Sequence, residues 1–164
     1  KSGKVRIEQG ALHKEYVYWQ YHVLSSLAYP ALPRRMERYS KRYDKFYSSF
    51  RFSLRQYFRS WHNVFYPQNK KIFPADLQLT PVTLAVWYMD DGCWTGKKAL
   101  ISIEGFDDES QKNIQKALLK EFNISTVIGK NKKLTIRKIS HNSFFGIMTP
   151  YIIPSMAYKI PQTP

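Results

Sequence analysis

Two adjacent carboxylates, Asp90 and Asp91, follow an apolar stretch and precede Gly92. Thr80-Pro81 ahead of that stretch is typical of an N-cap followed by proline at the first helical position, which predicts a helix over residues 81–92. Gly92 suits the left-handed position just past a helix end. Anions at the C-terminal end of a helix are unfavourable for the helix dipole, so a bound cation would explain the two acids. A plain Asp-Gly turn is the alternative.

The charge of the chain points to a polyanionic partner. Its 164 residues hold 26 Lys and Arg against 12 Asp and Glu, a net charge of +14, and 16% of them are aromatic. This excess is typical of nucleic-acid binders. Basic and aromatic residues alternate over 38–47 and 50–59, which on strands would put a cationic face opposite an aromatic one. Charges that only solvate a surface would be mixed in sign, yet residues 34–59 contain only two acids.

Other classes of site are disfavoured. The single cysteine, Cys93, excludes an internal disulfide, and the four histidines lack the spacing of zinc ligands. We find no apolar run of membrane-spanning length and no signal peptide. The sequence opens at Lys1 and not at a methionine, so we expect a fragment of a longer protein.

Hydrophobic periodicity predicts the same series of elements twice. The first series is a strand over 5–9, a helix over 12–28, strands over 35–39 and 49–54, and a helix over 56–65. The second is a strand over 99–104, a helix over 107–122, a hairpin of strands 126–129 and 134–138, and a helix over 142–151. Each series is followed by a lysine close to an Ile and a Pro, at Lys71-Ile72-Phe73-Pro74 and Lys159-Ile160-Pro161.

Such a duplication predicts an α+β protein with a pseudo-twofold arrangement of two halves, 1–76 and 77–164. Only the second half is preceded by an acid-tipped helix. We therefore expect the first half to be truncated at its N-terminus. Without a partner for the helix over 81–92, the apolar faces of Leu84, Trp87 and Tyr88 should be exposed.

The stretch Leu84 to Gly92, within this duplicated pattern, resembles the second motif of the two-motif, monomeric LAGLIDADG homing endonucleases. The resemblance implies two αββαββα halves with antiparallel, saddle-shaped sheets on DNA. It also implies a site-specific, intron-encoded endonuclease that cuts double-stranded DNA with Mg²⁺ in a mitochondrion or chloroplast. By itself, this chain is expected to be incompetent for double-strand cleavage, because it shows one acidic tip.

The resemblance assigns roles to single residues. Asp91 is the catalytic acid and, with Gly92, the metal site; Lys71 and Lys159 match the two active-site lysines; Gln9 and Glu104 match polar residues that orient metal-bound water. These types suit phosphodiester hydrolysis, since carboxylates hold Mg²⁺ and a lysine stabilises developing negative charge. The side chains expected to contact DNA are Arg35, Arg38, Lys41, Arg51, Arg55, Lys130, Lys132, Lys133, Arg137 and Lys138.

Two other functions remain open from the sequence. Some members of this family bind intron RNA and assist splicing as maturases, and a basic sheet suits RNA as well as DNA. A non-catalytic DNA-binding module on the same scaffold is the other. Loss of the acids would favour splicing, and Asp91 is present; whether the upstream coding sequence supplies another acid-tipped apolar helix would discriminate the DNA-binding module.

Overall fold

The computed structural model describes residues 4–55 and 58–162. The chain forms two compact units, Lys1–Asn63 and Val64–Pro164, each with its own sheet. The division falls inside a helix, ahead of the boundary after residue 76 that the repeat predicts. No helix among the described residues combines the length and apolarity needed to cross a membrane.

The first unit is a three-stranded antiparallel sheet with a helix on one face. Its elements are β1 (Arg6–Gly10), α1 (Lys14–Val23), β2 (Arg34–Ser40) and β3 (Lys45–Ser53), and the strand order is β1-β3-β2. The helix α2 (Arg59–Phe65) follows and spans the division between the units. Val17 of α1 packs against Phe52 and Leu54. Side chains alternate along a strand, so this packing divides the sheet into an α1-facing side and an outer side.

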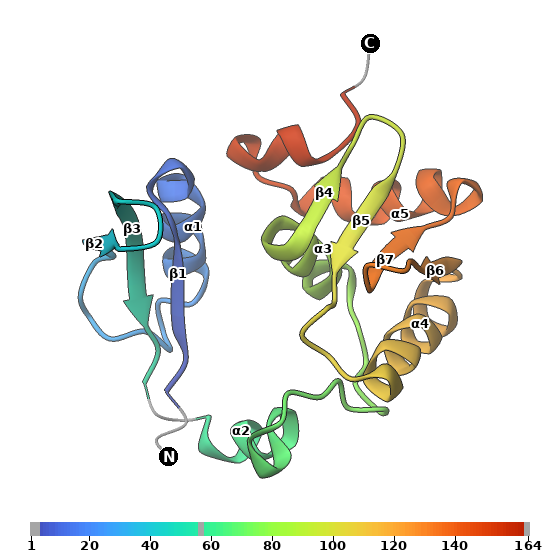
Figure 1. Ribbon diagram of the computed structural model, residues 1–164, viewed down its shortest axis with the longest axis horizontal. Helices are drawn as coiled ribbons and strands as arrows, with labels where there is room; N and C mark the ends of the chain where they lie inside the picture. The colour runs from blue at the N-terminus through green and yellow to red at the C-terminus, as the bar shows by residue number, and fades with distance from the viewer. Residues whose placement is uncertain (1–3, 56–57, 163–164) are drawn as a thin grey trace. The chain divides into compact units, whose positions relative to one another are not determined.

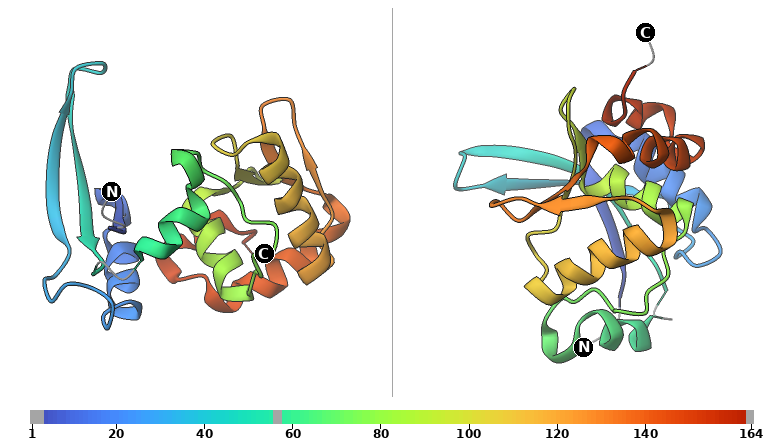
Figure 2. Two further views of the ribbon diagram at one scale, coloured as in Figure 1. Left: turned by 90° about the horizontal axis from the view of Figure 1, so that it is seen from below. Right: turned by 90° about the vertical axis from the view of Figure 1, so that its right-hand side faces the viewer.

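The β2–β3 hairpin reaches beyond the rest of this sheet (Figure 2). β1 pairs with β3 only from Ser49 to Ser53, whereas β2 pairs with β3 from Lys45 to Arg51. The connecting turn contains Asp44, which has a positive φ of 49°. The Asp44 carboxylate accepts a hydrogen bond from the Tyr39 hydroxyl. The hairpin therefore continues as a two-stranded ribbon over residues 45–48, of which residues 45–47 are exposed.

The second unit packs three helices against one face of a four-stranded antiparallel sheet (Figure 1). Its elements are α3 (Pro81–Asp91), β4 (Gly92–Trp94), β5 (Ala99–Ser102), α4 (Asp108–Phe122), β6 (Thr126–Ile128), β7 (Lys133–Ile136) and α5 (His141–Met148), with a 3-10 turn at Pro154–Lys159. The strand order is β4-β5-β7-β6. The core joins Leu84 and Tyr88 of α3 to Ile101, Leu118 and Phe144.

The repeated order of elements is confirmed. The series β1-α1-β2-β3-α2 matches the series β5-α4-β6-β7-α5. The strand orders match as well, since β1-β3-β2 corresponds to β5-β7-β6. Both series therefore fold with the same local topology.

Several expected boundaries were wrong. The helix expected over 12–28 ends at Val23, because the chain then turns so that Ala28 bridges Leu54 of the sheet. β4 was not predicted, since three residues directly after a helix give no strand periodicity. The helix expected over 142–151 ends at Met148 and continues as a 3-10 turn. Residues 56–57, the expected start of the helix over 56–65, lie outside the described residues.

The expectation of exposed apolar faces on the helix over 81–92 was also wrong. Leu84 and Tyr88 are both 0% exposed. Trp87 is partly buried and stacks on the ring of Phe73, with 6.4 Å between ring centroids. α3 therefore serves as a core helix of its own unit, which supplies the partners that a second helix was expected to provide.

Candidate acidic helix tip and nucleic-acid interface

α3 begins with a full capping box and delivers two carboxylates to its other end. The Thr80 hydroxyl accepts a hydrogen bond from the backbone N–H of Thr83, whose hydroxyl accepts one from the Thr80 N–H, and Pro81 takes the first helical position. Asp90 and Asp91 are the last two residues of the helix, and both are exposed. No acid lies in the first turn of α3, so its carboxylates gather only at the end that the dipole disfavours.

Gly92 is needed for close packing. Its φ of −86° and ψ of 156° are extended, so the expected left-handed conformation was wrong. A Cβ at this position would lie 2.2 Å from Cδ2 of Tyr88 and 2.3 Å from the Tyr88 carbonyl oxygen. Glycine lets the chain turn tightly over the Tyr88 ring and pass from the helix straight into β4.

Lys159 lies at the same helix end as the two acids. Its ammonium donates hydrogen bonds to the carbonyl oxygens of Met89 and, at 3.3 Å, Asp90. The Tyr88 hydroxyl in turn donates to the Lys159 carbonyl oxygen at 2.9 Å. Burial lowers the pKa of the Lys159 ammonium, and the nearby charges of Asp90 and Asp91 oppose part of that shift. A positive charge is thus held beside the acidic tip.

The acidic tip fits a partly hydrated divalent cation. Among the described residues, no group of three His, Cys, Asp or Glu side chains lies close enough to hold a metal. Mg²⁺ often needs only one or two carboxylates, because water and substrate phosphate oxygens complete its shell. The exposed carboxylate of Asp91 and the backbone at Gly92 could provide such a partial set of hard oxygen ligands.

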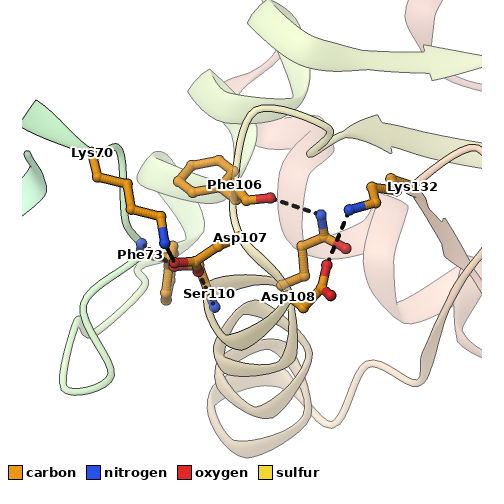
Figure 3. Close-up of polar contacts among 8 residues, drawn as sticks. Lys70, Phe73, Phe106, Asp107, Asp108, Ser110 and Lys132 are labelled. Carbon is orange, nitrogen blue, oxygen red and sulfur yellow. Dashed lines mark hydrogen bonds and ion pairs between the residues drawn. The ribbon is translucent and has the colours of Figure 1, made fainter.

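Lys71 lies in a segment that contacts the start of α4. Its ammonium lies 4.1 Å from the centroid of the Phe106 ring. The neighbouring Lys70 pairs with Asp107 at 3.0 Å, and the Phe73 N–H donates to the Ser110 hydroxyl at 3.0 Å (Figure 3). Among the described residues, no ion pair or hydrogen bond joins Lys71 to Asp91. Lys159 thus contacts the α3 tip directly, whereas the contact given for Lys71 is with Phe106, and its place in the site stays a prediction.

The two predicted water-orienting residues have different surroundings. Glu104 follows β5, is exposed, and lies 4.0 Å from the Lys133 ammonium. Gln9 is partly buried on β1 opposite Phe50, and therefore on the α1-facing side of its sheet. The neighbouring residue Glu8 faces the outer side.

The outer side of the first sheet is strongly basic. The register aligns Arg34 of β2, Arg51 of β3 and Glu8 of β1 across it. By alternation, the side chains on this side are Arg6, Glu8, Arg34, Met36, Arg38, Ser40, Lys45, Tyr47, Ser49, Arg51 and Ser53. We call this set the basic face. The expected separation of basic from aromatic residues is confirmed for Phe50 and Phe52, which point to α1.

The register corrects the placement of one predicted DNA contact. Arg35 pairs with Phe50 in the register, so it lies on the α1-facing side, where it donates to Ser48 and pairs with Glu37 at 3.1 Å. Arg34 occupies the basic face in its place. The other two predicted basic residues of these strands, Arg38 and Arg51, lie on the basic face, whereas Lys41 is exposed in the hairpin turn and Arg55 follows β3.

The basic residues predicted in the second unit surround the β6–β7 hairpin. Lys133 lies on the side of β7 opposite the core residue Leu134. Lys132 has a positive φ of 55° in the turn and pairs with Asp108 at 3.1 Å (Figure 3). The remaining members, Lys130, Arg137 and Lys138, are exposed. Each unit thus offers cationic side chains on or beside the helix-free side of its sheet.

Four charged residues of the basic face were not among the predicted DNA contacts: Arg6, Glu8, Arg34 and Lys45. Arg6, Glu8 and Arg34 share the face with Arg51, and counting by twos from Arg51 would have identified them only with the strand register known. That register depends on a turn over 41–44 with a left-handed Asp44, which has no strong sequence signature.

Comparisons with known proteins agree with this architecture. Residues 1–145 match the model of the LAGLIDADG DNA endonuclease family. The chain is 29% identical over 189 residues to the cytochrome b mRNA maturase bI2 of Saccharomyces cerevisiae, and 34% identical over 109 residues to the probable intron-encoded endonuclease 1 of Wickerhamomyces canadensis. The solved structure of the homing endonuclease I-WcaI bound to its DNA recognition sequence is similar, with a TM-score of 0.84 and 26% identity.

These matches differ in how much of each protein they cover. The alignment includes 98% of this chain but 42% of the yeast maturase, and 58% of this chain and 47% of the Wickerhamomyces protein. The likeness to I-WcaI covers 98% of this chain and 76% of that one. The chain therefore has the α+β fold of the homing endonucleases and belongs to the LAGLIDADG DNA endonuclease family.

Proposed function

We propose that this protein is a site-specific endonuclease that hydrolyses phosphodiester bonds of double-stranded DNA with a divalent metal ion, Mg²⁺. The observation that carries the proposal is the α3 tip, where the exposed carboxylate of Asp91 and the half-buried ammonium of Lys159 share one helix end. Hydrolysis of a phosphodiester needs a metal-binding acid and a positive charge near the reacting phosphate. The tip combines these groups.

Each group at the tip has a distinct part in the mechanism. Asp91, with the backbone at Gly92, would hold the ion, which when bound neutralises phosphate charge and makes water more acidic. Lys159, anchored on the Met89 and Asp90 carbonyls, keeps its ammonium in place to stabilise negative charge on the phosphate. Tyr88 fixes the backbone of Lys159. Roles for Lys71, Gln9 and Glu104 stay predictions.

The sheets supply the binding surface. The major groove of DNA admits a two-stranded β-ribbon, and the β2–β3 hairpin with its arginines has that form. Contacts of basic side chains to phosphates would supply affinity without sequence information, and contacts to base edges would supply specificity. I-WcaI, which shares this fold, is described as bound to its DNA recognition sequence. We expect the protein to act as a monomer.

The test is the pair of variants Asp91→Asn and Asp76→Asn in the full-length protein. Each removes one exposed carboxylate of the second unit, but Asp76 lies in a turn outside α3. With Mg²⁺ and duplex DNA that spans the intron-free target gene, Asp91→Asn should abolish cleavage and bind DNA as tightly as the wild type or more tightly. Asp76→Asn should cut normally. Wild-type nicking rates in Asp91→Asn would overturn the assignment.

Binding to intron RNA in a splicing role is the second candidate function. The observation that favours it is the alignment with an mRNA maturase over 98% of this chain. A splicing assay with the intron of the host gene separates the candidates. Splicing that depends on the protein and is unaffected by Asp91→Asn would establish the RNA role.

An intron-encoded origin in an organelle is part of the same proposal. The support is that relatives are named as intron-encoded or as acting on cytochrome b mRNA. Determining where the tagged full-length protein lies within cells of the source organism tests the organelle location.

A further inference from the structure

One carboxylate lies in the middle of the basic face. Glu8 is the only acid that β1, β2 and β3 place on that side of the first sheet, among four arginines. An acid at this point is unexpected on a surface that binds a polyanion, because like charges opposed across an interface are costly. The proposed cleavage chemistry does not use it.

Glu8 is held by residues from both other strands. Its Oε1 accepts a hydrogen bond from the Ser49 hydroxyl of β3 at 2.6 Å. Its Oε2 accepts one from Nη2 of Arg38 at 3.0 Å, across β3 on strand β2. The Glu8 side chain is 21% exposed, whereas that of Arg38 is 56% exposed. The carboxylate therefore lies low on the sheet and orders an arginine that projects from it.

The electrostatics of the cluster keep Glu8 ionised. The Ser49 hydrogen bond and the charges of Arg38 and Arg51 lower the pKa of the Glu8 carboxyl. Desolvation and repulsion from Arg34, Arg6 and Arg38 lower the pKa of Arg51, which shows how densely the cations are packed. A carboxylate offers about four acceptor positions, and the two contacts leave some for a ligand.

We propose that Glu8 is a specificity-determining residue of the DNA-binding surface. Its fixed negative charge keeps phosphate away from the centre of the basic face, and its remaining acceptor positions admit the exocyclic amino group of a cytosine or an adenine. By holding Arg38, it also directs that guanidinium to an adjacent base edge. This inference rests on the proposed DNA-binding function.

The first test compares the affinities of wild type, Glu8→Gln and Glu37→Gln, all in the full-length protein, for duplex DNA of arbitrary sequence. Both changes remove one carboxylate that pairs with an arginine of β2, but Glu37 lies on the α1-facing side. Glu8→Gln should raise affinity for arbitrary duplex on the order of tenfold, because a repulsive charge is lost at the interface. Glu37→Gln should change it less than about twofold. Equal effects would overturn the inference, because a merely structural role gives no gain in affinity.

The second test is selection of bound sequences from a random duplex library. The wild type should enrich cytosine or adenine at one position, and Glu8→Gln should relax that position while leaving the others unchanged. Glu8→Asp keeps the charge if the glutamine variant folds poorly. It should retain the low affinity for arbitrary duplex and weaken the same base preference.

The outcomes separate this inference from the proposed function. A wild-type protein that binds no duplex DNA refutes the proposed function itself. A wild type that binds and selects, with identical selection by both Glu8 variants, refutes only the role of Glu8.

Discussion

Hydrogen bonds to backbone carbonyls hold the C-terminal end of α3 in place. Tyr88 donates to the Lys159 carbonyl, and the Lys159 ammonium donates to the carbonyls of Met89 and Asp90. The last carbonyls of a helix lack intrahelical partners, so the Lys159 ammonium stabilises the helix end by binding them. Its positive charge also interacts favourably with the negative end of the helix dipole, which disfavours the two acids. The helix end can thereby carry two exposed acids.

Gly92 gives a prediction at the residue scale, because it has no room for a methyl group. Gly92→Ala would place a Cβ within 2.3 Å of the Tyr88 carbonyl oxygen, which is backbone and cannot move aside cheaply. Overpacking of this kind costs about 1–3 kcal/mol. Urea denaturation should therefore show a lower free energy of unfolding for Gly92→Ala. Gly105→Ala is the matched control, since nothing lies within 4 Å of its Cβ position. Equal stabilities of the two variants would contradict the packing argument.

At the scale of elements, the segment around Lys70 and Phe73 binds the start of α4. Asp107 is the N-cap of this helix and accepts from the Ser110 N–H at 2.9 Å, while Lys70 pairs with its other oxygen at 3.0 Å. The Ser110 hydroxyl accepts from the Phe73 N–H. The N-cap of α4 thus also holds the segment around Lys70 and Phe73, which leads to α3.

This capping site predicts a pH-dependent stability. The hydrogen bonds from Ser110, with the charge of Lys70, lower the pKa of Asp107 from 3.8 to about 2. A carboxyl whose pKa is lower in the folded state contributes stability that is complete above its unfolded pKa and is lost as pH falls through the folded value. The difference in thermal midpoint between wild type and Asp107→Asn should therefore be full at pH 5 and shrink toward pH 2. Asp108→Asn, which removes a neighbouring acid that pairs with Lys132 and caps nothing, is the control. A difference that stays constant with pH would contradict this role for Asp107.

Across the whole molecule, sequence reasoning succeeded where signals are local and failed where they depend on distant pairing. The cap at Thr80, the end of α3 at Asp91 and the repeated order of elements could be predicted, because caps and periodicity are set by near neighbours. The face that Arg35 occupies could not, because it depends on the register of a hairpin. The contact of Lys159 with α3 spans 70 residues, and it was suggested by the likeness between the repeats and by the family resemblance, not by any local pattern.

The charge of the whole molecule sets the last prediction, the dependence of DNA binding on salt. With a net charge of +14 and a basic face on the first sheet, binding of duplex DNA should release many condensed counterions. Each phosphate that the protein neutralises contributes about −0.9 to the slope of log affinity against log salt. Arg34 and Arg35 are neighbours on β2, both exposed, but Arg34 lies on the basic face and Arg35 on the opposite side. In fluorescence anisotropy titrations at several salt concentrations, Arg34→Ala should therefore make the slope shallower by about one phosphate contact, whereas Arg35→Ala should leave it unchanged. The reverse result would place DNA on the α1-facing side of the hairpin. A flat slope for the wild type would argue against a nucleic-acid partner, because counterions are released wherever lysines and arginines neutralise phosphates.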